Sequence, residues 1–318
     1  MTVPSDADLN PVPVHLRRDL VARGWTDRML DRAVRRGELA RPRRGAYVDG
    51  PTFAASTRPA RHRLTARAVL AASPVPLVVS HASALAFHGG PDWGLDLDVV
   101  DVTRPDRRCG RSEAGVRQHR GRLLDGDVCT LGGVPVTSAA RAALELTTQV
   151  DLETAVVHID DLIRRGLTTG EELAARYATG MVHWPRSVTT DLALRLADGR
   201  SESVAESRFR MLAWREHLPR PDAQVLVTDH RGRVVARLDF AWPEHRVFLE
   251  VDGRAKYTTL LGPGETVQDV VLAEKRREDL VRRLTGWRCV RIGWADLDRP
   301  AATAAMIRRV LDEMADPA

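Results

Sequence analysis

The sequence predicts an α/β multidomain protein with three parts: a small helix–helix–hairpin module, a mixed α+β middle domain and a C-terminal domain of αβββαβ order. The chain has 318 residues, more than a single hydrophobic core usually serves. A hydrophobic content of 43% and a charged content of 29% are those of ordinary folded proteins. From Ser201 onward the expected order of elements becomes one helix, three strands, a helix, a strand and a final helix. The segment from Pro51 to Pro59 is typical of a linker. We therefore place the domains at 1–58, 59–198 and 199–318.

Composition excludes several classes of protein. The first residues lack a basic start followed by an apolar run, and nowhere do about 18 uncharged apolar residues occur together. The cysteines, Cys109, Cys129 and Cys289, are odd in number, far apart and without CxxC spacing, which disfavours a disulfide framework or a zinc site. We expect a cytoplasmic protein with no membrane partner.

Positive charge is concentrated at the N-terminus. Residues 1–65 hold 13 arginines against 7 acidic residues, whereas the whole chain has a net charge of +5, so the remainder is close to neutral. A basic end of a chain most often binds a polyanion such as nucleic acid. The alternative is an ordinary solvated face.

The first part has the pattern of two helices and a two-stranded wing. Apolar residues at helical spacing run from Val14 to Gly24, and Thr26 can cap a second helix that stops at Gly37. A short, turn-rich, β-prone segment follows. Arginines on or beside the second helix and in the wing could reach phosphates or guanine edges in a major groove. These candidates are Arg28, Arg32, Arg35, Arg36, Arg41, Arg43 and Arg44.

The segment RRDLVARGWTDRMLDRAVRRGELARPRRGAYV resembles the N-terminal winged helix-turn-helix domain of AbiEi-type antitoxins from type IV toxin-antitoxin systems. The resemblance covers about 40 residues and rests on a basic helix followed by RGELxRxRRGxYV. It implies binding to double-stranded DNA, often an operator, and a cognate toxin as a partner. A small helical adaptor without DNA contact is the alternative.

The middle domain alternates helices with short strands, and its sequence contains no recognisable catalytic motif. Thr137 or Ser138 is expected to cap one helix and Asp151 the next. His81 and His88 are expected to be structural at their spacing. SHASALAFHG and GVPVTSAARAALEL resemble segments of the same antitoxin-like proteins.

The C-terminal domain begins with a helix that Ser201 is expected to cap. Three strands, a helix, a strand and a final helix follow, an order that fits an α/β sandwich. If WPEH forms the turn between the second and third strands, Asp239 lies opposite Phe248 and Glu250 lies diagonally across on the same face. The two carboxylates then converge, whereas a slip of one residue would separate them.

A metal site is one explanation of these acids. Glu250 and Asp252 share one face of a nearly apolar strand, where a carboxylate is costly unless it is paired or binds a cation. Mg²⁺ takes one or two carboxylates and keeps waters, and it can generate a hydroxide nucleophile. The alternative is a salt-bridged strand in which Arg237, Arg246 or Arg291 neutralises the acids.

The same region resembles the very-short-patch-repair-like branch of the PD-(D/E)XK nucleases, which have a restriction-endonuclease-like fold. ESVAESRFRMLAW, RLDFAWPEHRVFLEVDG and EKRREDLVRRLTGWRCVRIGWADL carry the resemblance over about 100 residues. It implies that Asp239 and Glu250 are the core acids and metal ligands, and that Glu206 is the helix acid that completes the site. Glu202 is the weaker candidate for that role.

One position departs from the nuclease pattern. Asp252 stands where the pattern expects a lysine two residues after the second acid. The chain has two lysines, Lys256 and Lys275, both in this domain. Either Asp252 acts as a further ligand, or one lysine reaches in from another element, or activity is lost. We favour an intact catalytic site in which Asp252 is a ligand or orienting group and one lysine stabilises charge at the phosphate.

The leading hypothesis is a DNA-binding protein with an Mg²⁺-dependent DNA endonuclease domain, acting in defence or DNA repair. A non-catalytic, antitoxin-like transcriptional repressor with a degenerate nuclease fold is the main alternative. In a third hypothesis the whole chain binds a toxin and the winged helix is silent. A homodimer would suit a double-strand cutter or an operator binder, but the sequence shows no interface.

Overall fold

The computed structural model describes residues 12–106, 112–113, 115–252 and 267–315; for 112–113 and 267–275 the description covers the backbone alone. The chain divides into two compact units, Met1–Ala197 and Asp198–Ala318. Within the described ranges, every helix is too short or too polar to cross a membrane.

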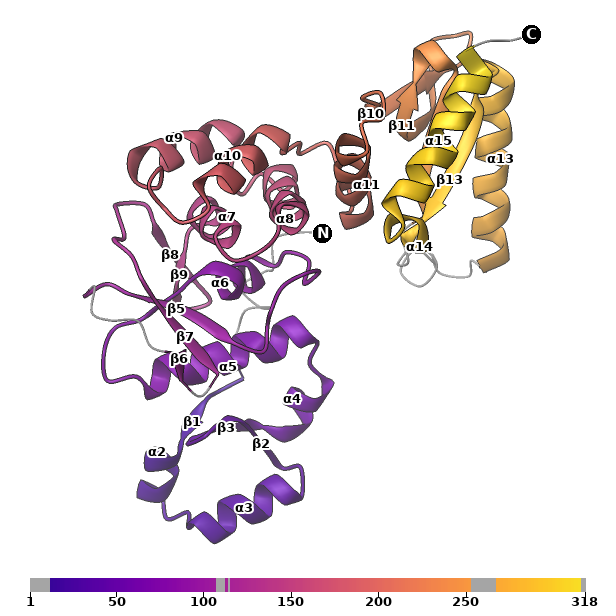
Figure 1. The fold of residues 1–318 in the computed structure, drawn as a ribbon. Helices are drawn as coiled ribbons and strands as arrows, with labels where there is room; N and C mark the ends of the chain where they lie inside the picture. The colour runs from indigo at the N-terminus through magenta and orange to yellow at the C-terminus, as the bar shows by residue number, and fades with distance from the viewer. Residues whose placement is uncertain (1–11, 107–111, 114, 253–266, 316–318) are drawn as a thin grey trace. The chain divides into compact units, whose positions relative to one another are not determined.

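Unit 1 begins with a small module of two helices and a three-stranded sheet of order β1-β3-β2 (Figure 1). Thr26 caps α3 as predicted, because its side chain accepts the backbone N–H of Met29 at 3.3 Å. Gly45 adopts a φ of +80° in the tight turn between Arg43 and Ala46, a conformation that favours glycine. The elements are β1 (His15–Leu16), α2 (Arg17–Ala22), α3 (Asp27–Arg35), β2 (Leu39–Arg43) and β3 (Ala46–Asp49).

The core of this module is small. Leu20, Leu30 and Tyr47 form one buried cluster, and Leu16 and Ala46 pack with Ala68 of the following long helix in a second. Val21 and Met29, which fit the helical pattern of the sequence, are exposed instead. Each of the two short helices packs only one of its sides against the core, so Val21 and Met29, which lie outside that side, meet solvent.

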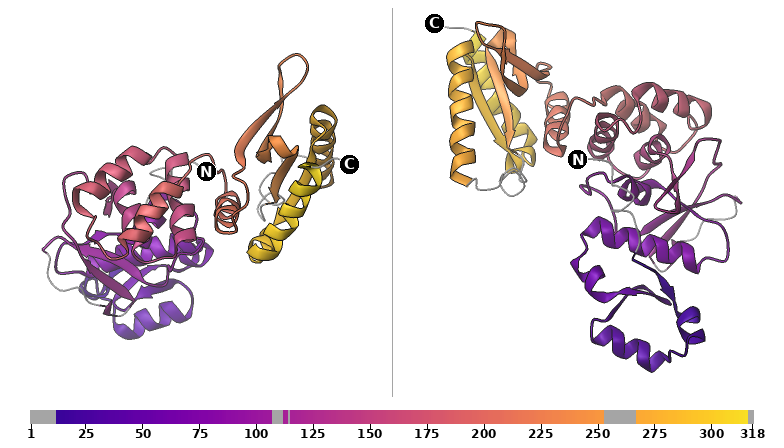
Figure 2. Two further views of the ribbon diagram at one scale, coloured as in Figure 1. Left: turned by 45° about the horizontal axis from the view of Figure 1, so that its top comes forward. Right: turned by 180° about the vertical axis from the view of Figure 1, so that it is seen from behind.

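The rest of unit 1 is a six-stranded mixed sheet of order β6-β7-β5-β4-β9-β8 with helices against it. In Figure 1 and in the rear view of Figure 2, α5 lies between this sheet and the small module. Ser138 is the N-cap residue of α7, but it makes no side-chain cap hydrogen bond, whereas Asp151 caps α8 with a 2.8 Å bond to the backbone N–H of Thr154. The elements are α4 (Gly50–Ala55), α5 (Arg58–Ala72), β4 (Val78–Val79), α6 (His81–His88), β5 (Val100–Arg104), β6 (Ser112–Glu113), β7 (Val116–Arg120), β8 (Val128–Leu131), β9 (Val134–Thr137), α7 (Ala139–Thr147), α8 (Leu152–Arg164), α9 (Gly170–Gly180) and α10 (Ser187–Leu196).

Unit 2 is a four-stranded sheet with helices on both faces. The strands run in the order β10-β11-β12-β13, antiparallel except for the parallel β12–β13 pair. One face packs on α11 and α15 through Phe209, Leu249 and Ile307, and the other on α13 through Phe248 and Val281. The elements are α11 (Val204–Arg215), β10 (Asp222–Thr228), β11 (Val234–Trp242), η1 (Pro243–His245), β12 (Val247–Asp252), α13 (Val267–Thr285), β13 (Arg288–Gly293), α14 (Trp294–Leu297) and α15 (Pro300–Ala315).

Two predicted details of unit 2 are wrong. Ser203, rather than Ser201, caps α11, because the hydroxyl of Ser203 accepts the backbone N–H of Glu206 at 3.2 Å. The hairpin register differs as well, since Ala241 rather than Asp239 lies opposite Phe248. The turn occupies residues 243–246, one position later than the predicted WPEH, so the strands pair two residues out of the predicted register. A shift of two keeps each side chain on its predicted face.

Candidate functional site

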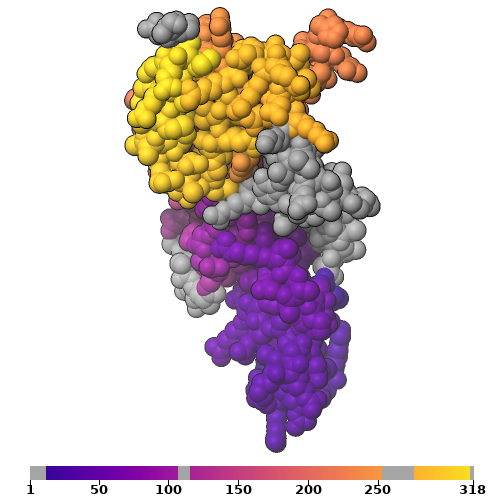
Figure 3. All heavy atoms as spheres, turned by 90° about the vertical axis from the view of Figure 1, so that its right-hand side faces the viewer, coloured from indigo at the N-terminus to yellow at the C-terminus, as the bar shows by residue number. Residues whose placement is uncertain are grey.

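Helix α3 presents a stripe of arginines. Arg28, Arg32 and Arg35 are exposed and stand at i, i+4 and i+7, so they share one face, opposite the buried Leu30. Arg36, at the end of the helix, pairs with Glu38 at 3.6 Å. In the space-filling view of Figure 3, the indigo N-terminal segment forms the tapered end of unit 1. Because all three side chains are exposed, the stripe is accessible to a large ligand.

The hairpin adds three more arginines beside this helix. Arg41 and Arg44 are exposed, and Arg43 is half-buried. Among the residues that the structure describes, six of the seven predicted arginines, all but Arg36, have no carboxylate within ion-pairing distance. Structural arginines on a protein surface are commonly neutralised by neighbouring acids. Unneutralised arginines on one helix and one hairpin are instead typical of a phosphate-binding surface.

The predicted acidic pair lies where the antiparallel pairing of β11 and β12 ends. Phe240↔Leu249 is the last pair in this ladder, and Asp239 and Glu250 are the next residue on each strand. One oxygen of Asp239 accepts the backbone N–H of Val251 at 2.8 Å, which takes the place of a ladder hydrogen bond. The side chain of Asp239 is thereby held against β12.

Arginines neutralise the other two strand acids in part. Glu250 is buried at 3% exposure and accepts from the guanidinium of Arg277 on α13 at 3.1 Å. Asp252 ion-pairs with Arg291 on the neighbouring strand, with 3.6 Å between Nη1 and Oδ1. Arg291 was a predicted partner, whereas Arg277 was not. Arg237, another predicted partner of the strand acids, pairs instead with Glu202 at 2.6 Å. Glu202, the weaker candidate for the helix acid, is therefore engaged in an ion pair.

Glu206 has a structural role that the sequence analysis missed. Its carboxylate accepts the backbone N–H of Glu202 at 2.9 Å, the hydroxyl of Ser203 at 2.8 Å and the amide of Gln224 at 2.9 Å. Ser203 and Glu206 have the S-x-x-E spacing of a capping box, a signal that is visible in the sequence. Burial raises the pKa of the Glu206 carboxyl, and the nearby charge of Asp239 raises it further. Glu206 is thus close to Asp239 while it also closes the start of α11.

Two predicted residues cannot be placed at the site. Lys256 lies outside the described residues, and Lys275 lies on α13, where only the backbone is described. Within the described part of the chain, no group of three or more His, Cys, Asp or Glu side chains is arranged to hold a metal ion. Asp239 and Glu250 are oxygen donors of the kind that Mg²⁺ takes, and Mg²⁺ often binds one or two carboxylates with waters and substrate phosphate. The pair therefore suits the ion by its chemistry.

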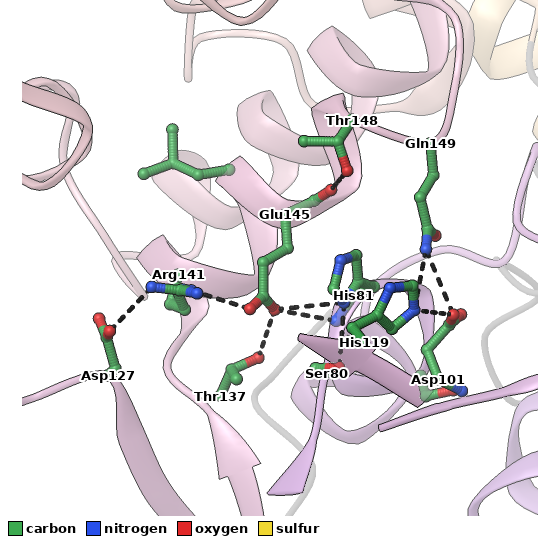
Figure 4. Close-up of polar contacts among 12 residues, drawn as sticks. Ser80, His81, Asp101, His119, Asp127, Thr137, Arg141, Glu145, Thr148 and Gln149 are labelled. Carbon is green, nitrogen blue, oxygen red and sulfur yellow. Dashed lines mark hydrogen bonds and ion pairs between the residues drawn. The ribbon is translucent and has the colours of Figure 1, made fainter. Parts of the chain in front are cut away.

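Unit 1 contains a buried ionic network that the sequence analysis did not predict. Glu145 on α7 is fully buried and accepts from Nε of Arg141 at 2.8 Å, from the hydroxyl of Thr137 at 3.1 Å and from the backbone N–H of His81 at 3.0 Å (Figure 4). Arg141 also donates to Asp127 at 2.9 Å. The Glu145 carboxylate therefore satisfies the first backbone N–H of α6, where helix N-termini favour negative charge.

A second buried carboxylate lies beside this network. Asp101 accepts from Nε2 of His119 at 2.6 Å, from Gln149 at 3.2 Å and from Arg117 at 3.3 Å, all on one oxygen. Its other oxygen is buried without a hydrogen-bond partner among the described residues. The His119 ring stacks on His81 with 3.7 Å between the ring centroids. Burial holds the pKa of His81 well below its ordinary value, so this imidazole is neutral at pH 7.

This network does not have the geometry of a catalytic triad. Nδ1 of His81 faces both the Ser80 hydroxyl at 3.0 Å and the Glu145 carboxylate at 3.7 Å. A nucleophile–base–acid relay needs the two ring nitrogens to face different partners. His88 is structural as expected: it is buried, and its Nε2 donates to the backbone carbonyl of Thr137 at 2.9 Å. A buried, hydrogen-bonded ionic network of this kind fixes helices to a sheet.

Comparisons with known proteins agree with the position of the arginine surface. Residues 16–48 match the family model described as a transcriptional regulator, AbiEi antitoxin. The chain is also similar to two proteins from strains of Mycobacterium tuberculosis, the uncharacterised proteins MT2308 and Rv2248. Each is 28% identical over 291 residues, which cover 90% of this chain and 97% of the relative. The similarity therefore extends through both units, whereas the regulator family is matched at the N-terminal module.

Proposed function

We propose that this chain is a DNA-binding transcriptional regulator whose N-terminal module docks on duplex DNA. The observation that carries the proposal is the set of six arginines on α3 and the β2–β3 hairpin that have no carboxylate partner among the described residues. The match of residues 16–48 to the AbiEi antitoxin regulators supports the same role. In this proposal α3 lies in a major groove and the hairpin contacts the backbone beside it.

Selection from a random pool of duplexes tests the proposal. The full chain is immobilised, bound duplexes are amplified and sequenced over several rounds, and the Arg28→Gln, Arg32→Gln, Arg35→Gln triple variant is treated in parallel. We expect a short motif to be enriched by the wild-type chain and lost with the variant. Equal enrichment by both proteins would place DNA recognition elsewhere, and no enrichment by either would contradict a sequence-specific regulator.

A second function, hydrolysis of DNA by unit 2, is favoured by a separate observation. Asp239 and Glu250 occupy neighbouring positions at the end of the β11–β12 ladder, and Glu206 is close enough to Asp239 to feel its charge. We propose that Asp239 and Glu250 hold Mg²⁺, which on binding would polarise a phosphate and lower the pKa of a water. Arg277, on Glu250, would then stand beside the phosphate and neutralise charge that develops on it.

A plasmid assay tests this second function. Supercoiled plasmid is incubated with the chain and MgCl₂ or with EDTA, and nicked and linear products are measured for the wild type, Asp239→Asn and Asp222→Asn. Asparagine keeps an oxygen that can accept the Val251 N–H, so Asp239→Asn should fold. The control, Asp222, is exposed at the start of the same sheet. We expect Asp239→Asn to lose at least tenfold in rate and Asp222→Asn to lose nothing. If all three proteins are equally inert over a range of substrates, unit 2 is a non-catalytic platform.

A further inference from the structure

A cavity of about 170 Å³ in unit 1 has guanidinium groups on several sides. Its walls come from the loop before β8, from α7 and α9, and from the segment that follows α9. The residues that matter for its chemistry are Arg122, Leu124, Asp127, Arg141, Arg176 and Trp184. The cavity adjoins the buried network of Figure 4 at Arg141 and Asp127, and the proposed regulator and nuclease functions do not use it.

The charges around this cavity do not balance. Asp127 is fully buried and accepts from Arg141 at 2.9 Å, from Arg176 and from the backbone N–H of Leu124 at 2.7 Å. Glu145 takes the second donor of Arg141. Two carboxylates therefore offset two guanidinium groups. Arg122 is exposed and makes no ion pair with the residues that the structure describes, which leaves one positive charge in excess among the lining residues and Glu145.

One donor in this cluster lacks an acceptor. Nε of Arg176 is buried and has no hydrogen-bond partner among the described residues. Both oxygens of Asp127 are already occupied, one by Arg176 through Nη1 and the other by Arg141. A buried charged donor without a partner is costly, and Arg176 lines the cavity, so an acceptor that draws this side chain toward the cavity would gain a charge-assisted hydrogen bond.

The size and lining of the cavity limit what can enter. At about 170 Å³ it is smaller than the roughly 300–1,000 Å³ of pockets that hold drug-sized ligands. Cζ of Arg141 lies over the ring of Trp184, 4.5 Å from the ring centroid. Trp184 and Leu124 together form an apolar wall of the cavity. Guanidinium groups match the geometry of phosphate oxygens. We propose that this cavity binds a phosphate group, either as the free ion or as a phosphomonoester whose ester carbon contacts the apolar wall.

Isothermal titration calorimetry tests the proposal with the full chain in EDTA, so that no divalent ion at unit 2 contributes. Inorganic phosphate, AMP and adenosine are titrated at constant ionic strength. The variants are Arg122→Gln, Arg176→Lys, Arg195→Gln as an exposed control, and Arg28→Gln, Arg32→Gln, Arg35→Gln to remove the stripe on α3. Arg176→Lys keeps a charge for Asp127, so the buried ion pair survives, but it removes the Nε donor.

We expect one saturable phosphate site per chain. Arg122→Gln and Arg176→Lys should each weaken it about tenfold, the typical effect of one charge-assisted hydrogen bond. The control and the α3 variant should bind as the wild type does. Binding of AMP but not adenosine would show that the phosphomonoester is accepted, and binding of inorganic phosphate alone would assign the site to the free ion. Non-saturable binding, equal binding of adenosine, or loss of binding only in the α3 variant would overturn the proposal.

Discussion

Neutralising the arginine stripe of α3 should halve the salt dependence of DNA binding. The perturbation is the triple variant Arg28→Gln, Arg32→Gln, Arg35→Gln, three exposed positions that contribute nothing to the core around Leu30. Each phosphate neutralised by an arginine contributes about −0.9 to the slope of log K against log salt. Six arginines without carboxylate partners then give a slope of about −5.4, and the three that remain give about −2.7.

The difference is large enough to measure. Between 50 and 200 mM KCl the affinity of the wild type should fall roughly two-thousandfold and that of the variant about fortyfold. Fluorescence anisotropy with a labelled duplex of about 30 base pairs, repeated at five salt concentrations, gives both slopes. Far-ultraviolet circular dichroism checks that the variant is folded.

A matched triple variant controls for net charge. Arg186→Gln, Arg195→Gln and Arg231→Gln remove the same charge from exposed positions outside the N-terminal module. Its slope should stay near the wild-type value. If the α3 variant keeps the wild-type slope, or if the control lowers the slope equally, the arginines of α3 do not contact phosphates and the docking model is wrong.

Three further predictions concern stability. Leu30→Ala removes a fully buried side chain from the small module and should cost about 2–5 kcal/mol in urea unfolding; a loss below about 1 kcal/mol would show that this core tolerates a cavity. Arg141→Met should cost about 3–5 kcal/mol in unit 1, because it leaves the buried Glu145 carboxylate without a cation and Asp127 with Arg176 alone, and a variant as stable as the wild type would refute that network's ionic character. Burial raises the pKa of Glu206, so the folded state binds the proton more tightly than the unfolded state, and the contribution of Glu206 to the stability of unit 2 should fall as pH rises above about 4.3. Glu206→Gln keeps a capping side chain, removes this titration and should flatten that part of the profile, as thermal unfolding at pH 4 to 7 would show.

Much of the local structure of this chain could be predicted from the sequence. Thr26 and Asp151 cap the helices that were expected to follow them, because a capping side chain acts within three residues of itself. The same local reasoning applies to Ser203 and Glu206, whose S-x-x-E spacing is the sequence signal that favours a cap at Ser203 over one at Ser201. Helix and hairpin order in the N-terminal module likewise follows from spacing and turn residues.

The buried network of unit 1 could not be predicted in the same way. Its members come from β5, β7 and β9, from the start of α6, from the loop before β8, and from α7 and the residues after it, and they meet only when the six-stranded sheet has formed. One clue was present: Arg141 and Glu145 stand at i and i+4 in an otherwise apolar helix. Such a pair signals a buried ion pair only if the whole helix is buried, and burial depends on distant segments.

The sequence by itself determined where charge and chemistry concentrate: the arginines of residues 28–44, and the acids Asp239 and Glu250 on adjacent strands. Only the tertiary structure decided what each of these side chains contacts. The register of β11 and β12 depends on the residue at which their turn begins, Glu250 and Asp252 receive arginines from α13 and β13, and Glu206 is held by its own helix start. The physical reason is that the type of a residue is local, whereas its ion pairs and its burial are set by segments brought together by the packing of the sheet.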